Sequence, residues 1–222
     1  MQKFDTAAAI VTVLAVPAGR IRLLASDRAD TTVEVRPADP SRSRDVKTAE
    51  RTEVAYADGV LRIEVPKPKN DLLGGDTGSV EVTVQLPAGS RVEARAAATE
   101  LTTAGRLGDV TFEGAYRRIT VEEAASLRLT AADGDIEVGR LTGSADLTTA
   151  RGDIRVAQAV GGTVDLTTQR GDIEITAAAG VSAVLDAGTA YGRVTNTLKN
   201  DGTPALTVRA TTSYGDIAAR SL

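Results

Sequence analysis

The residues with the clearest chemical potential recur around a Gly-Asp pair. The positions are Gly134, Asp135, Gly152, Asp153, Gly171, Asp172, Gly215 and Asp216, with Gly192 at the equivalent place before Arg193. Alignment on the next aliphatic residue stacks three aspartates in adjacent repeats, which is a possible cation ladder. The dense Asp/Gly nonapeptide of calcium-binding β-rolls is absent. We therefore predict no metal, turn glycines with positive φ, and aspartates that accept backbone N–H bonds beside arginines.

The residue before each turn glycine varies, and it is the strongest candidate for recognition. The aromatic and basic members of this set are Tyr116, Arg151, Arg170, Tyr191 and Tyr214. If the repeats stack, these side chains line one exposed edge, with Arg170 over Tyr191 and Tyr191 near Tyr214. Such an edge can bind a protein or a glycan. The alternative is that these residues only shield the corner of the fold.

Two of these turns spell the Arg-Gly-Asp tripeptide, at 151–153 and 170–172. Integrin recognition is the functional hypothesis that this tripeptide raises. The same position carries Asp133, Tyr191 and Tyr214 in other repeats, so arginine is not required there. We interpret the tripeptides as turn chemistry with an exposed corner arginine.

A Pro- and Gly-rich loop over residues 66–78 contains Leu72 and Leu73. Its GGDTG segment does not match GxxxxGK[ST], so no phosphate cradle is predicted. Two interpretations of the leucines stay open. They either cover apolar surface of the same molecule or contact a partner.

Composition excludes several classes of function. The 222 residues include no His and no Cys, which removes Ser-His-Asp and Cys-His catalysis and most zinc sites. With Lys plus Arg at 26 against Asp plus Glu at 30 and aromatics at 3%, no surface for nucleic acid is expected. We predict no cofactor and no enzymatic activity. Acidic pairs such as Glu122-Glu123 leave a carbohydrate-active enzyme as the third-ranked alternative.

The elements that position these residues are β-strands. The aliphatic residues after the turns, Leu101, Ile119, Ile136, Ile154, Ile173, Val194 and Ile217, are 17 to 23 residues apart. This period predicts an all-β fold, a β-solenoid or β-helix of about seven repeats over residues 91–222. Residues 1–90 predict antiparallel strands that pack on and cap it, with at most one short helix at 45–53. Together they form one continuous unit.

The ends of the repeat array decide between a monomer and a filament, because an open β edge can template further stacking. The last two repeats are the longest and contain the 196–204 excursion, which we interpret as a cap. A monomer or small homo-oligomer is therefore expected. End-to-end self-assembly is the second-ranked function.

The apolar run at 7–18 is too short to span a bilayer and lacks a clear cleavage site, so we interpret it as a buried strand. No integral membrane segment is predicted. We expect a cytoplasmic protein, with a secreted or envelope-associated location as the alternative.

The T-x-x-G-D-[IV] turns and the SVEVTVQLPAGS segment at 79–90 together resemble a bacterial family. This is the family of adhesin-like β-strand-repeat, or toastrack, domains of unknown function. The resemblance implies a β-solenoid-like domain without catalytic residues, in relatives that often sit beside membrane segments. The composition fits a high-GC bacterium such as an actinobacterium. Our first-ranked function is a non-catalytic binding or scaffold protein that engages a protein or glycan through an exposed edge.

Overall fold

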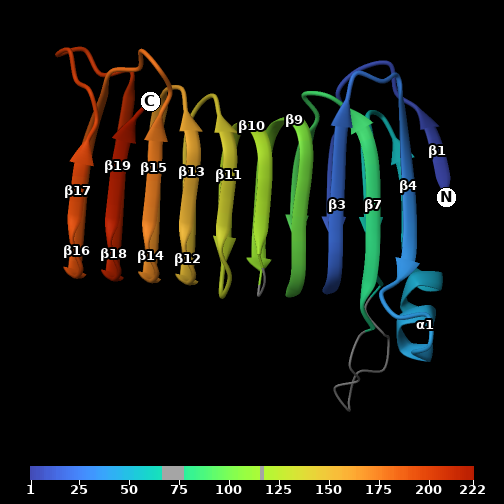
Figure 1. The fold of residues 1–222 in the computed structure, drawn as a ribbon. Helices are drawn as coiled ribbons and strands as arrows, with labels where there is room; N and C mark the ends of the chain where they lie inside the picture. The colour runs from blue at the N-terminus through green and yellow to red at the C-terminus, as the bar shows by residue number, and fades with distance from the viewer. Residues whose placement is uncertain (67–77, 116–117) are drawn as a thin grey trace.

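The computed structural model describes residues 1–66, 78–115 and 118–222. Within these residues, 19 strands join one continuous hydrogen-bonded sheet, and a single short helix lies beside it. The sheet doubles back on itself into two layers (Figure 1). Strands β9 (Ala98–Ala115) and β10 (Ile119–Ala131) run through both layers, which is why the two layers share one sheet.

Each layer has a defined order of neighbouring strands. The first layer contains β1 (Gln2–Asp5), β4 (Asp30–Pro37), β7 (Val80–Pro87), β3 (Ala18–Ser26), the first parts of β9 and β10, β11 (Ile136–Leu141), β13 (Ile154–Ala159), β15 (Ile173–Ala177), β19 (Ile217–Ser221) and β17 (Val194–Thr197). The second contains β5 (Glu53–Ala57), β6 (Val60–Glu64), β2 (Val11–Ala15), β8 (Arg91–Arg95), the second parts of β9 and β10, β12 (Ala145–Arg151), β14 (Gly162–Arg170), β18 (Leu206–Tyr214) and β16 (Ala183–Tyr191).

The core lies between the layers and follows from period-two alternation. Inward aliphatic residues stack in register across parallel strands, as in the ladder Leu101, Ile119, Ile136, Ile154 and Ile173. All five are fully buried. Outward residues on the same strands are mainly Thr, Arg, Glu and Asp. A strand of one layer and the strand opposite it in the other layer therefore bury their aliphatic faces between them and against the strands of the adjacent repeats.

The order of the last two repeats differs from the prediction. Ile173 pairs with Ile217, and Ile217 pairs with Val194, so β18 and β19 lie between β14/β15 and the outermost pair β16/β17 (Figure 1). The C-terminal tail is consequently an interior strand. The 196–204 excursion connects the outermost pair back to it. Residues at equivalent places in each repeat fit either neighbour, so periodicity specifies register without specifying order.

The N-terminal region was predicted to be antiparallel, and the structure corrects this to a mixed arrangement. β3 pairs in parallel with both β7 and β9, and β2 pairs in parallel with β6 and β8. Only β1–β4, β4–β7 and β5–β6 are antiparallel among the described strands. The segment Gly19-Arg20-Ile21 has the same Gly-x-aliphatic spacing as the later turns, and Ile21 pairs with Leu101. That spacing was the signal in the sequence that could have predicted the parallel pairing of β3 with β9.

The helix α1 (Ser43–Arg51) lies close to the predicted 45–53 segment. The buried Asp45 carboxylate accepts backbone N–H bonds from Asp39 at 3.1 Å and Ser79 at 3.0 Å, and Thr48 Oγ1 accepts one from Gly78 at 3.1 Å. These bonds tie α1 to the start of β7. No helix in the described ranges is long and apolar enough to cross a membrane.

Candidate functional site

The turns that connect the two layers are tightly stacked on one another. Gly152 has φ +138°, and a Cβ on it would lie 2.3 Å from the Gly134 carbonyl oxygen of the adjacent repeat. Gly134, Gly171 and Gly215 share this positive φ, whereas Gly192 does not. A side chain at Gly152 would therefore meet both a strained backbone and a neighbouring main chain.

Besides backbone bonds, each Gly-Asp turn is held to the next by two hydrogen bonds that involve side chains. The Asp135 carboxylate accepts the Asp153 N–H at 3.0 Å, and the Thr149 hydroxyl donates to the Gly134 carbonyl at 3.2 Å. Equivalent bonds recur along the array, with the backbone N–H groups of Asp172, Asp216 and Arg193 donating to the carboxylates of Asp153, Asp172 and Asp216, and the hydroxyls of Thr168, Thr212 and Thr189 donating to the carbonyls of Gly152, Gly171 and Gly215. The T-x-x-G-D motif is thus a chain of bonds between repeats.

Arginine side chains form ion pairs with three of these aspartates. Arg118, Arg155 and Arg193 have guanidinium nitrogens 3.5, 3.2 and 3.5 Å from carboxylate oxygens of Asp135, Asp153 and Asp216. Backbone N–H groups and arginines together offset the repulsion that stacked carboxylates would otherwise have. The described residues contain no cluster of three or more His, Cys, Asp or Glu side chains arranged for a metal ion.

The same bonds explain the two Arg-Gly-Asp tripeptides. The Asp153 and Asp172 carboxylates are used between repeats, and Gly152 and Gly171 lie in the turns. Arg151 forms an ion pair with Asp133 at 2.7 Å. In this fold the glycine and aspartate of each tripeptide therefore form the turn and its bond to the next repeat.

The residues before the turn glycines lie along one exposed edge. Their spatial order is Arg151, Arg170, Tyr214 and Tyr191, as the strand register dictates. We call these four residues the rim stripe. All four side chains are exposed, and Tyr191 is 67% and Tyr214 50% exposed.

The contacts within the rim stripe correct one prediction. The Arg170 guanidinium carbon lies 5.7 Å from the ring centroid of Tyr214, not over Tyr191. The Tyr214 ring stacks on Tyr191 with centroids 4.9 Å apart and an interplanar angle of 5°. The reason is the insertion of β18, which places Tyr214 between Arg170 and Tyr191. Tyr116, Leu72 and Leu73 lie outside the described residues.

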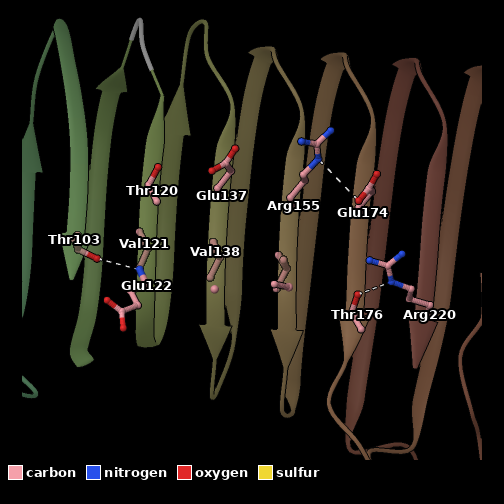
Figure 2. A pocket seen from close by; sticks show the side chains of 13 residues that line it. Thr103, Thr120, Val121, Glu122, Glu137, Val138, Arg155, Glu174, Thr176 and Arg220 are labelled. Carbon is pink, nitrogen blue, oxygen red and sulfur yellow. Dashed lines mark hydrogen bonds and ion pairs between the residues drawn. The ribbon is translucent and has the colours of Figure 1, made fainter. Parts of the chain in front are cut away.

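The sequence did not point to a second feature, a groove of about 500 Å³ on the outer face of the first layer (Figure 2). It crosses β9, β10, β11, β13, β15 and β19. Its lining includes Thr103, Thr120, Glu122, Glu137, Gly139, Arg155, Ala157, Glu174, Thr176 and Arg220. Gly139 and Ala157 are exposed, and their small size hollows the face between charged neighbours. The sequence signal for this groove was the pair of small residues at these two outward positions. It can be recognised only when the strand register is known.

The charged groups in this groove already have partners. Figure 2 shows Arg155 directed at Glu174, at 3.9 Å, and Arg220 bonded to the Thr176 hydroxyl at 3.0 Å. Glu122 accepts the Gly105 N–H at 3.0 Å. A ligand in the groove would have to compete with these contacts. By contrast, the Tyr191 ring at the outer end of the rim stripe already faces solvent.

Solved structures with a similar fold come from other bacteria. A Bacteroides fragilis protein, described as a "putative adhesin", aligns with a TM-score of 0.55 at 16% identity over 98% of this chain and 95% of that chain. A Clostridium sporogenes protein, described as a "putative cell adhesion protein", aligns with a TM-score of 0.44 at 12% identity over 100% and 98%. The first of these shows a shared fold.

No curated protein matches the chain in sequence. A family model does match, and it spans the strands of both the N-terminal region and the repeats. The resemblance that the turn motif indicated is confirmed. Because the model described as Toastrack DUF4097 matches residues 13–221, the chain belongs to the Toastrack DUF4097 family.

Proposed function

We propose that this protein is a non-catalytic binding protein of the adhesin-like type, which engages a protein or a glycan through the rim stripe. The observation that carries the proposal is the continuous stack of Arg170, Tyr214 and Tyr191 on an exposed edge. The parallel, in-register repeats support a β-solenoid as the scaffold that presents it.

The chemistry of the stripe fits recognition better than shielding. Tyr191 and Tyr214 contribute little to the core, because half or more of each side chain is exposed. Aromatic rings held in place by stacking offer a rigid surface for a planar group or the apolar face of a sugar. Arg170 is held beside them as a donor for a carboxylate or carbonyl group.

The test is the double substitution Tyr191→Ala with Tyr214→Ala, compared with wild type on glycan arrays and on whole bacterial and host cells. We expect binding at least about fivefold weaker, the effect of removing an interface hot spot. Leu24→Ala is the matched control, because Leu24 is another exposed large side chain and lies on β3, away from the stripe. Unchanged binding by the double variant, with the fold intact by circular dichroism, would reject the proposal.

End-to-end assembly is the second candidate, and it is favoured by the outer edge of β16, which pairs with no second strand among the described residues. The residue type in the outermost turn argues against assembly. Arg193 occupies the place at which the other four stacked turns carry an aspartate, so the outermost turn offers no carboxylate to the N–H of a further repeat. We therefore rank assembly below binding.

A further inference from the structure

The outermost strand of the second layer, β16, has one hydrogen-bonded neighbour among the described strands, β18. At its other edge the Ala183 N–H donates to the Lys199 carbonyl at 2.9 Å, and beyond Ala183 this edge has no backbone partner among the described residues. The strand is nine residues long, and Asp186 is its only charged residue. Natural proteins usually blunt such an edge with charges, proline or a short strand.

The two edge strands of the first layer, β17 and β1, carry those devices. β17 has only four residues, and Arg193 and Lys199 flank it. β1 also has four residues and includes Lys3 and Asp5. Compared with these strands, β16 is long and sparsely charged, which is typical of an edge that receives another strand.

Side chains on β16 lack the neighbours that equivalent residues have inside the array. The inward Leu185 and Ala187 are only partly buried, because β16 has no neighbouring strand on its outer side among the described residues. The outward Asp186 lies in register with Arg209, but Arg209 pairs with Asp165 at 3.4 Å. Within the described part of the chain, Asp186 forms no ion pair.

The turn beside β16 limits what can be added. A complete repeat added here would lack the inter-repeat hydrogen bond to a carboxylate, because arginine stands at position 193. β17 is short and all four of its residues are exposed. The open end therefore suits a single strand alongside β16 better than a repeat that spans both layers.

We propose that β16 binds an extended peptide of a partner protein as an added outer strand. The peptide carries a basic residue between two aliphatic residues, opposite Asp186, and an arginine or tyrosine five positions later, over Tyr191. β18 has this pattern at Val208-Arg209-Ala210 and Tyr214. The proposal rests on the proposed function for Tyr191 and adds the class of partner. Backbone bonds supply the affinity and the two side chains the selectivity.

The experiment uses the full-length protein and a fluorescent peptide with the sequence of residues 206–214, LTVRATTSY. Fluorescence anisotropy is expected to show saturable binding. Asp186→Asn is expected to weaken it about two- to fivefold, the range for an exposed ion pair. Asp146→Asn is the matched control, because Asp146 lies on the same outward row in interior strand β12 and should leave binding unchanged.

Two further peptides, N-methylated at alternate residues in opposite phases, test for strand pairing. Addition at an outer edge uses one edge of the peptide, so one phase is expected to bind and the other to fail. Loss of binding in both phases would mean that the peptide replaces β18, which is paired on both sides. That result, the absence of saturable binding, equal binding of both phases, or no effect of Asp186→Asn would overturn the proposal.

Failure here is separable from failure of the proposed function. If the peptide does not bind but the Tyr191→Ala, Tyr214→Ala variant still loses binding on arrays or cells, the rim stripe stands and strand addition to β16 is rejected. If the tyrosine variant also retains full array and cell binding, both are rejected.

Discussion

The two ends of the strand array share one topology but finish differently. At each end the order of the strands in space differs from their order in the chain. β2/β3 lie between β6/β7 and β8/β9, and β18/β19 lie between β14/β15 and β16/β17 (Figure 1). The C-terminal strand β19 is thereby an interior strand, whereas the N-terminal strand β1 is the outermost strand of the first layer.

The N-terminal end is sealed by further elements, whereas the outer edge of the C-terminal end is open beyond Ala183, whose N–H donates to the Lys199 carbonyl. At the N-terminal end, antiparallel β1, β4 and β5 add beyond the parallel strands, and α1 packs against β4 and β7. At the C-terminal end, β16 and β17 are outermost, with Val184, Tyr191 and Val194 exposed. The lesson is that one repeat chemistry can end in two ways, depending on whether further elements cover the last parallel strands.

The largest expected effect separates the stacked interior from the open end. Gly152→Val combines strained φ with overlap on the Gly134 carbonyl, so we expect a loss of about 3–5 kcal/mol in the free energy of unfolding. Gly202→Val is the control near the open end. Gly202 has φ +98° but no heavy atom within 4 Å of a built Cβ, so only the backbone strain of about 1 kcal/mol applies. Urea titrations showing equal losses would contradict the tight stacking of the turns.

The next effect tests the sealed end. Asp45→Ala removes the acceptor for the Asp39 and Ser79 N–H groups, and we expect a loss of about 2–3 kcal/mol. Asp201→Ala is the comparison at the open end, because Asp201 is exposed, although its carboxylate also accepts hydrogen bonds, from Ser182 and Thr203. Thermal unfolding should shift clearly only for Asp45→Ala. Similar shifts for both would mean that α1 does not seal the N-terminal end.

A third substitution is designed to remove the difference between the ends. Arg193→Asp supplies the carboxylate that the outermost turn lacks, so a further repeat from a second molecule could form the missing hydrogen bond. We expect concentration-dependent association in sedimentation velocity with little change in stability. Arg193→Asn removes the charge without adding a carboxylate and should stay as wild type. If neither variant associates, position 193 does not terminate the array.

The smallest effect is a pH dependence at the sealed end. Hydrogen bonds from Arg28 and Lys3 lower the pKa of Asp30 from 3.8 to about 2. Because the folded pKa lies below the unfolded one, the stabilisation is complete above about pH 4 and is lost as the pH falls toward 2. The difference in melting temperature between wild type and Asp30→Asn should shrink over this window. A constant difference from pH 5 to pH 2 would contradict the assigned partners.

The sequence by itself determined the register of the repeats. Strand side chains alternate with period two, so a one-residue slip would expose the aliphatic ladder that includes Ile136 and Ile154. The turn glycine and aspartate reinforce this register through bonds that form only in one alignment. For the same reason, the alignment of Arg151, Arg170, Tyr191 and Tyr214 along one edge was predictable from residue spacing.

Only the tertiary structure decided the order of the repeats at the two ends. Strands such as β16 and β18 carry the same inward pattern, so either fits beside β14 energetically, and the connecting segments choose between them. That choice places Tyr214 over Arg170, leaves the outer side of Tyr191 open, and leaves Asp186 without an ion pair among the described residues. Register is a local property of alternation, whereas order depends on the path of the chain, and the candidate recognition surface depends on both.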